Sequence, residues 1–495
     1  MNKEKKKGVG AVDFFCIGFG AIVGVGWAVS INSWMTSCGG PIPAALGYLL
    51  VLIMMVPIAL CYCELVPMYP VAGGGMTFAY KGFNRHIAFL SGWMALGAFV
   101  WIVPWEAIQL TDVLGYLFPV LKQGTPLYQS FGSDIHLTTI VLGIGFSLLL
   151  YALNMKGLAT AAFAQRILCF VLVLSALVGA VAALCGGSTQ NLLPVYDTAD
   201  PSIYGEGLKT VTHRSTFGGC FAIVATAAFF LAGFETIPQG IEDAGGDIKS
   251  VGKTVVLSVG LACLFYALLL ICFGIGWPWR QFANMPRPAA ATMFLSLFPG
   301  VGGKLLYWVL ILGAIAGLFT TWNGFFTPSA NLLMSMGRGK LVFPFFARQN
   351  SGGVAVYGQL FVLILSCCGP FLGPNLIDSI TSFSGAAFIL SWMITAWSLV
   401  MCRVRYPDKK RPYRIPGGIA TGIFAGTVSS AAFIFMFVPS SPFYIGATAV
   451  KMFFGWLAVG LLFYLASFPQ RRKLTNEELE MGVFGSALSD AEKEG

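Results

Sequence analysis

Charged side chains are scarce in this sequence. Only 10% of its 495 residues are Asp, Glu, Lys or Arg, whereas soluble globular domains carry roughly 25%. Apolar residues make up 57% of the chain, which leaves too little polar surface to cover a folded protein in water. This composition excludes an ordinary soluble enzyme or binding domain and indicates a protein that lies in a lipid bilayer.

Residues that build metal and catalytic sites are also few. The three histidines, His86, His136 and His213, lie near the ends of apolar segments and form no cluster. No Cys-x-x-Cys pair occurs, and most of the 12 cysteines lie inside apolar segments, where a thiol behaves as a small hydrophobic group. Walker and Gly-x-Ser-x-Gly motifs are missing. We expect no metal, no cofactor and no enzymatic activity.

Long apolar segments dominate what is present. A helix needs about 20 mostly apolar residues to cross the hydrocarbon core of a membrane. We therefore predict an all-α integral membrane protein with about 12 transmembrane helices. The predicted spans are 11–37, 41–66, 87–118, 137–153, 157–185, 216–241, 252–277, 301–336, 354–372, 376–401, 417–438 and 444–468.

Basic residues are unevenly distributed between the loops. Twelve spans place both termini on one side, and that side carries 22 Lys and Arg residues against seven on the other. Because cytoplasmic loops are enriched in Lys and Arg, we predict cytoplasmic termini in a multi-pass protein of the plasma membrane. The same bias explains the net charge of +9 without a nucleic acid partner.

The first span contains an unusual run of glycines. Gly18, Gly20, Gly24 and Gly26 fall within nine residues, and each costs about 1 kcal/mol relative to Ala inside a helix. The run predicts a break in the helix. The alternative is a close helix-packing face, which the same spacing would also produce.

The sixth span has a second weak point. Gly233 is followed by Pro238 and Gly240, and proline removes a backbone donor from a helix. Interruptions at corresponding positions in two halves of a chain point to a transporter's binding site. Broken helices present free N–H groups to a carboxylate and free carbonyls to an ammonium. Together the two interruptions predict a site for the zwitterionic head of an amino acid.

Three ionisable residues are candidates for substrate or proton binding because charge inside a membrane is costly. Glu106 and Glu235 are candidate proton carriers or counter-ions for an amine, or alternatively structural carboxylates capped by N–H groups or neighbouring side chains. Arg166 is a weaker candidate, since it can extend to the membrane surface or pair with a carboxylate.

Five blocks of sequence then occur in a familiar order. They are Gly20-Ala-Ile-Val-Gly-Val-Gly26, Cys61 through Tyr80, Phe230-Leu-Ala-Gly233-Phe-Glu235, Asn323 through Arg338, and Arg411-Pro-Tyr-Arg-Ile-Pro416. Together they cover nearly the whole chain, and the sequence resembles the amino acid–polyamine–organocation permeases.

The resemblance implies a leucine-transporter-type fold. It places two inverted five-helix repeats at 11–185 and 216–401, joined by an extracellular loop at 186–215. A basic cytoplasmic loop at 402–416 precedes two further helices at 417–468. Cytoplasmic segments at 1–10 and 469–495 complete the chain.

The resemblance also implies roles for individual residues. Substrate-binding positions fall at Ile22, Val23, Gly24, Val25, Gly26, Phe229, Ala232 and Gly233. Candidate gates are Phe230, Phe234, Trp322 and Phe326.

One departure affects the energy source. Some proton-coupled members carry a lysine in the middle of the fifth helix, where this sequence has Leu172 and Val173. Proton symport, sodium symport and exchange against a counter-substrate all stay open.

We expect a secondary transporter for a small amino acid with an apolar or neutral side chain, working by alternating access. The alternatives are an amine or polyamine carrier, an amino acid/amine exchanger, or a ligand sensor that does not transport.

Overall fold

The computed structural model describes residues 9–193, 195, 216–245, 248–282, 285–286, 288–441 and 443–485. Three predicted segments therefore lie partly outside the described residues. They are the N-terminus at 1–10, the extracellular loop at 186–215 and the tail at 469–495.

The described chain is almost entirely helical. Nine helices within it are long and apolar enough to cross a membrane. They are α1 (Ala11–Val23) taken with α2 (Gly26–Val29), α4 (Pro41–Met68), α6 (Arg85–Leu117), α7 (Leu137–Asn154), α8 (Leu158–Gly186), α11 (Ile248–Gly276), α14 (Val301–Arg338), α16 (Ile377–Arg405) and α18 (Ala447–Ala466).

Three further segments correspond to the remaining predicted spans. Two are shorter apolar helices, α15 (Val356–Cys368) and α17 (Ile419–Phe435), and the third is the interrupted pair α9 (Thr216–Ala222) and α10 (Val224–Phe230). The helices begin and end within a few residues of the predicted spans, because the length of each apolar segment can be counted directly in the sequence. The prediction of an all-helical membrane protein is confirmed.

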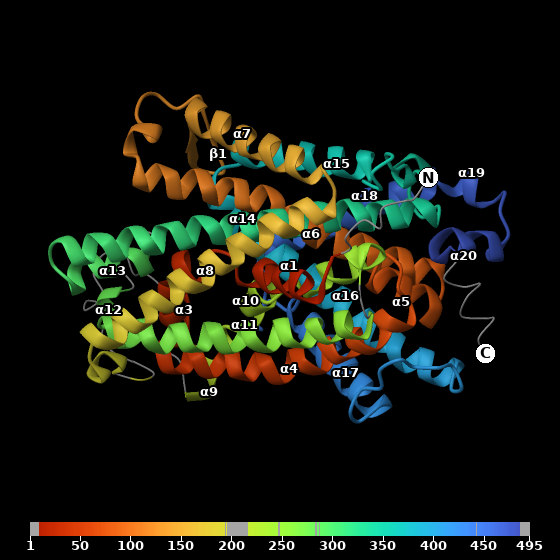
Figure 1. The fold of residues 1–495 in the computed structure, drawn as a ribbon, viewed down its shortest axis with the longest axis horizontal. Coiled ribbons are helices and arrows are strands. Elements are labelled where there is room, and N and C mark those ends of the chain that lie inside the picture. Colours follow the sequence, from red (N-terminus) through yellow and green to blue (C-terminus); the bar gives the residue numbers. More distant parts are fainter. Residues whose placement is uncertain are drawn as a thin grey trace.

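Short elements lie at the two ends of the bundle (Figure 1). One end carries α5 (Gly75–Gly82), α19 (Phe468–Arg471) and α20 (Asn476–Phe484), and we call it the α5 end. The opposite end, the α13 end, carries α12 (Trp279–Phe282) and α13 (Ala289–Leu297). The remaining short helix is α3 (Ile31–Cys38), and a two-stranded hairpin is formed by β1 (Tyr128–Ser130) and β2 (Ser133–Ile135).

Local sequence cues set several helix ends. The side chain of Asn84 accepts hydrogen bonds from the N–H groups of His86 and Ile87 and so caps the start of α6. Thr475 and Glu478 form a reciprocal capping box at the start of α20. These caps satisfy N–H groups that have no partner within the helix itself.

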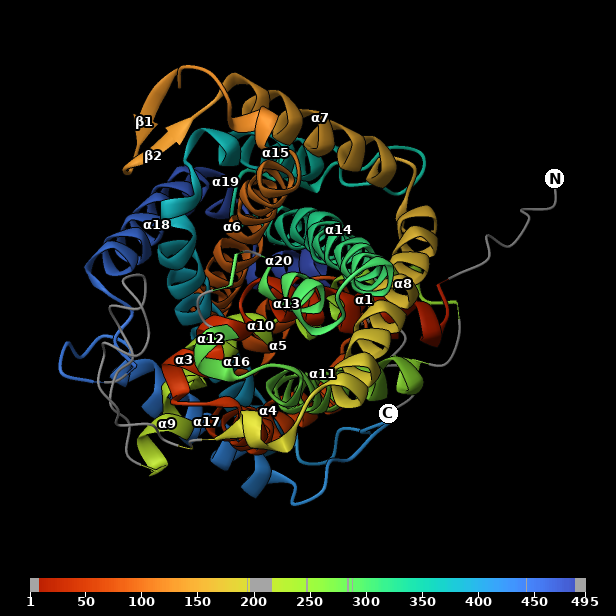
Figure 2. The same cartoon turned by 90° about the vertical axis from the view of Figure 1, so that its left-hand side faces the viewer.

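The bundle has a central group of helices and a rim. The most apolar windows of α1 with α2, of α6 and of the span containing α16 are each 83% buried, against 17% for α18 and 28% for α7. Viewed along the bundle, α7, α8 and α18 lie at the rim while α1, α6 and α10 lie further in (Figure 2). Both predicted helix breaks therefore lie in the protein core, away from lipid.

Candidate functional site

The first helix breaks at Gly24. Its φ of 46° lies in the left-handed region, which glycine adopts without the penalty of a β-carbon. As a result α1 ends at Val23, and α2 starts at Gly26. Any β-carbon at Gly24 would also lie only 2.4 Å from the hydroxyl oxygen of Thr321. The predicted interruption of this span is confirmed.

The second break follows α10. The helix ends at Phe230, Gly233 adopts a φ of 142°, and the chain continues as 3-10 turns at Phe234–Thr236 and Pro238–Asp243. A β-carbon on Gly233 would lie 2.7 Å from the backbone nitrogen of Ile22. The two breaks are therefore in direct contact.

A cavity lies where the two breaks meet. Its volume is about 20 Å³, room for about one water molecule, so a larger ligand requires the surrounding helices to move. The lining residues are Ala21, Ile22, Val23, Gly24, Val25, Gly26, Ile102, Trp105, Glu106, Phe229, Phe230, Ala232, Thr321 and Phe325.

Backbone polar groups of the first break face this region. Within the described part of the chain, the N–H of Val25 donates no hydrogen bond. Across the break, the carbonyls of Ile22 and Val23 accept hydrogen bonds from the Tyr266 hydroxyl at 3.0 and 2.5 Å. Each carbonyl keeps a second lone pair. The break thus offers a donor and two acceptors close together.

Glu106 is the acidic residue of the cavity. Its side chain comes from the middle of α6 and is 1% exposed. One carboxyl oxygen, Oε2, has no hydrogen-bond partner among the described residues. An unpaired carboxyl group in a dry site is costly, so it favours either a proton or a cationic ligand.

Glu235 has a different environment. Its carboxylate accepts a hydrogen bond of 2.8 Å from the N–H of Gly233 and another from the indole N–H of Trp392. It is absent from the cavity lining. This carboxylate therefore caps the second break and satisfies a donor that the broken helix leaves free.

Aromatic rings close the cavity toward the α13 end. The Phe230 ring lies 4.9 Å from that of Trp34 and 6.5 Å from that of Trp105, between ring centroids. Phe229 packs against Trp105 at 5.4 Å. On the other side of the break, Phe234 packs between Tyr62 and Trp392.

Polar contacts close the path toward the α5 end. The side-chain oxygen of Gln239 accepts a hydrogen bond from the N–H of Gly73, and the backbone carbonyl of Gln239 accepts one from the side chain of Asn331. Both bonds are 2.9 Å long. Arg338 donates to Glu242 at 2.7 Å. These contacts join the turn after α4, the 3-10 turn after the second break and the end of α14. The cavity is consequently closed toward both ends.

Six candidate residues are not among those that line the cavity: Gly233, Phe234, Glu235, Arg166, Trp322 and Phe326. Trp322 donates its indole N–H to Ser366 at 3.2 Å, and Phe326 is fully buried elsewhere in the core. Arg166 pairs with Asp13 at 3.2 Å and is 38% exposed. That ion pair ties α8 to the start of α1, which matches the alternative role of pairing with a carboxylate.

Five lining residues were missed by the sequence analysis: Ala21, Ile102, Trp105, Thr321 and Phe325. Ile102 lies four residues before Glu106, and Thr321 lies four before Phe325. Residues four apart share a helix face, so a projection of the helix face through Glu106 would have found Ile102. Thr321 and Phe325 share a face with each other, but the candidates on that helix, Trp322 and Phe326, each lie one residue further along.

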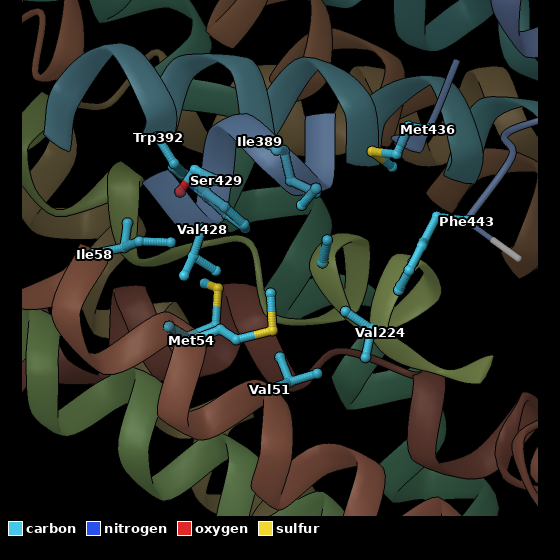
Figure 3. A pocket seen from close by; sticks show the side chains of 13 residues that line it. Val51, Met54, Ile58, Val224, Ile389, Trp392, Val428, Ser429, Met436 and Phe443 are labelled. Carbon is cyan, nitrogen blue, oxygen red and sulfur yellow. The ribbon is translucent and has the colours of Figure 1, made fainter. Parts of the chain in front are cut away.

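A second cavity lies on the other side of α10 (Figure 3). Val51, Met54 and Ile58 of α4 face Val224 of α10 and residues of α16 and α17 across it. Ser429, which also lines it, donates its hydroxyl to the Ala425 carbonyl. This cavity of about 30 Å³ offers apolar surface and is unsuited to a zwitterion.

Comparison with known proteins identifies related sequences. The family described as "Amino acid permease" matches residues 9–463. A branched-chain amino acid permease of Bacillus subtilis (strain 168) is 20% identical over 482 residues, covering 95% of each chain. A glutamate/serine transporter of the same organism is 24% identical over 440 residues, covering 84% of this chain and 75% of the relative. A polyamine transporter of Oryza sativa subsp. japonica is 24% identical over 434 residues, covering 86% of this chain and 72% of the relative.

Proposed function

The chain belongs to the amino acid permease family, and from this premise we propose that it carries a small amino acid with an apolar or neutral side chain. The observation that supports this proposal is the cavity at the two helix breaks. Its side chains are mostly apolar, while backbone groups of Ile22, Val23 and Val25 supply the polar contacts.

The proposed binding mode follows from these groups. The carboxylate of the substrate accepts from the N–H groups of the break at Val25 and Gly26. Its ammonium donates to the carbonyls that end α1. The side chain of the substrate then lies against Ile102, Phe229 and Ala232, none of which carries a charge.

We assign Glu106 the role of counter-ion for the ammonium or carrier of a coupled proton. Its unpaired oxygen supports this role. Glu235 and Arg166 act instead as structural residues in this scheme, because each already has a partner.

Alternating access would proceed by opening one closure at a time. Phe230 is the proposed gate toward the α13 end, with Phe234 on the opposite side of the break. On helix α14 we assign the role of aromatic gate to Phe325, in preference to Trp322 or Phe326, because Phe325 lines the cavity.

A second candidate substrate is an amine or polyamine. The position of Glu106 in the cavity favours it, because a carboxylate in an apolar site attracts a cation. An amine without a carboxylate would leave the N–H of Val25 unused, whereas an amino acid uses both kinds of backbone group. We therefore place this substrate second.

Uptake into proteoliposomes tests the proposal. Labelled neutral amino acids and polyamines are supplied with a proton gradient, with a sodium gradient, or with substrate loaded inside. We expect neutral amino acids to accumulate and to exchange. Failure to transport any zwitterion under all three conditions would overturn the proposal, and tight binding without counterflow would indicate a sensor.

The proposed location is the plasma membrane, with the α5 end in the cytoplasm. The excess of Lys and Arg in the loops of that side supports this orientation.

A further inference from the structure

A groove runs along the outside of the bundle between α4 and α11, which lie side by side in both views (Figures 1 and 2). Its volume is about 670 Å³. The residues that line it are Leu60, Cys63, Ser250, Lys253, Thr254, Val256, Leu257, Gly260, Leu261, Leu264 and Tyr413.

The lining is divided along the length of the groove. Polar groups, including Lys253 and the hydroxyl residues Ser250 and Tyr413, lie at the α5 end, where α11 begins. Beyond them, Leu257 and Leu264 are 52% and 49% exposed. The 15 residues from Ser250 to Leu264 span about 21 Å of helix. Half of a hydrocarbon core is about 15 Å thick, so the groove matches one leaflet together with its headgroup region.

The ammonium group of Lys253 has no carboxylate beside it in the described part of the chain. Throughout the described ranges its side chain forms no ion pair and no hydrogen bond, and it is exposed. Two other basic residues of this end, Arg403 and Arg411, are engaged by Glu64. A free cation at the mouth of an apolar groove complements an anion attached to an apolar chain.

Gly260 keeps the groove open. A β-carbon built at this position would meet no atom of the protein within 4 Å. The glycine therefore serves no close helix contact, and the space beside it faces the hydrocarbon region.

We propose that this groove binds a phospholipid with an anionic headgroup. The phosphate lies at Lys253 with Ser250 and Tyr413 beside it, and one acyl chain lies along Leu257, Gly260 and Leu264. Basic pockets between helices on the cytoplasmic side of membrane proteins recognise anionic headgroups in this way. The proposal is independent of the substrate, since it depends only on the location of the chain in a bilayer.

Lipid-dependent stabilisation of the purified protein tests the proposal. Unfolding temperature is measured in detergent as phosphatidylglycerol, phosphatidylcholine with the same acyl chains, or inorganic phosphate is added. We expect phosphatidylglycerol to raise the unfolding temperature at a lower concentration than phosphatidylcholine does, and we expect inorganic phosphate alone to have no effect. Equal effects of the two lipids, or a full effect of phosphate, would overturn the proposal.

Matched variants locate the site. Lys253→Ala should weaken the phosphatidylglycerol effect about fivefold, since one lysine near an anionic surface contributes about 1 kcal/mol. Gly260→Leu should weaken it by filling the groove. The controls are Lys156→Ala, another exposed lysine of this end, and Gly145→Leu, another glycine with open space on an exposed helix face. Wild-type behaviour of both groove variants, or equal losses in the controls, would contradict the assignment.

Discussion

Two buried glutamates show how much depends on the immediate surroundings of a residue. Glu106 and Glu235 are 1% and 4% exposed. The carboxylate of Glu235 accepts from Gly233 and Trp392, whereas Glu106 keeps an oxygen without a partner in the described protein. Burial alone therefore does not identify a functional carboxylate. The absence of a local partner, in a residue that lines the cavity, singles out Glu106.

Glu106→Gln should reduce uptake by about tenfold to a hundredfold. A hydrogen bond to a charged group contributes about 1.5–3 kcal/mol, and the amide cannot carry a negative charge. Initial rates in proteoliposomes measure the effect. Asp112→Asn is the control, because Asp112 lies on the same helix and pairs with Lys122 away from the cavity. Uptake by Glu106→Gln equal to that of the control would remove the proposed role.

Gly233→Ala should abolish most uptake. The alanine would be strained at a φ of 142° and its β-carbon would lie 2.7 Å from the backbone of Ile22, which cannot yield as a side chain can. Gly302→Ala is the control, since that position has no atom within 4 Å. Normal transport and unfolding temperature in Gly233→Ala would show that the two breaks are not held in this contact.

At the scale of elements, the short helix α20 connects parts that are far apart in the sequence. Phe484 is 3% exposed and packs against Tyr69, after α4, and Tyr80, in α5. Lys81 pairs with Glu480 and lies 4.8 Å from the Phe484 ring centroid. Gly482 lies against the end of α14. Helix α20 therefore connects α5 to the end of α14, which takes part in the polar contacts that close the α5 end.

Phe484→Ala should lower the unfolding temperature and make α20 more susceptible to proteolysis. Truncating a buried phenylalanine costs about 3–5 kcal/mol, through lost burial and the cavity left behind. Proteolysis of α20 and thermal unfolding in detergent measure the two effects. Met481→Ala, on the same helix with a side chain 55% exposed, should change neither. If both variants behave alike, α20 does not hold this end together through Phe484.

At the scale of the whole molecule, the bundle arranges its helices by burial. The two broken segments lie inside, and the weakly buried α7 and α18 face outward. Irregular backbone in a membrane must be covered by protein, because lipid cannot satisfy its polar groups. This requirement explains why both breaks lie together in the core.

Thiol labelling tests the orientation of the whole chain. Cys185 is exposed near the end of α8, toward the α13 end. A membrane-impermeant maleimide should label it in intact cells. In a background with Cys185→Ser and Cys368→Ser, which removes both exposed thiols of the described residues, Met481→Cys at the α5 end should react only after permeabilisation. The reverse pattern would show that the α5 end faces outward.

Apolar segments and backbone-breaking residues were enough to locate the membrane helices and the breaks in two of them. Apolar length, glycine and proline act through the local backbone, so the interruption at Gly24 and the one before Pro238 were visible without a fold. The candidate backbone positions from Ile22 to Gly26 all line the cavity for the same reason.

Which side chains face one another depends on how the helices pack. Phe325 lines the cavity while Phe326 does not, because one residue turns a helix by about 100° and packing against neighbouring helices sets that rotation. Glu235 and Glu106 likewise differ through partners contributed by other elements. Such contacts join residues more than a hundred positions apart, so no local pattern in the sequence could assign them.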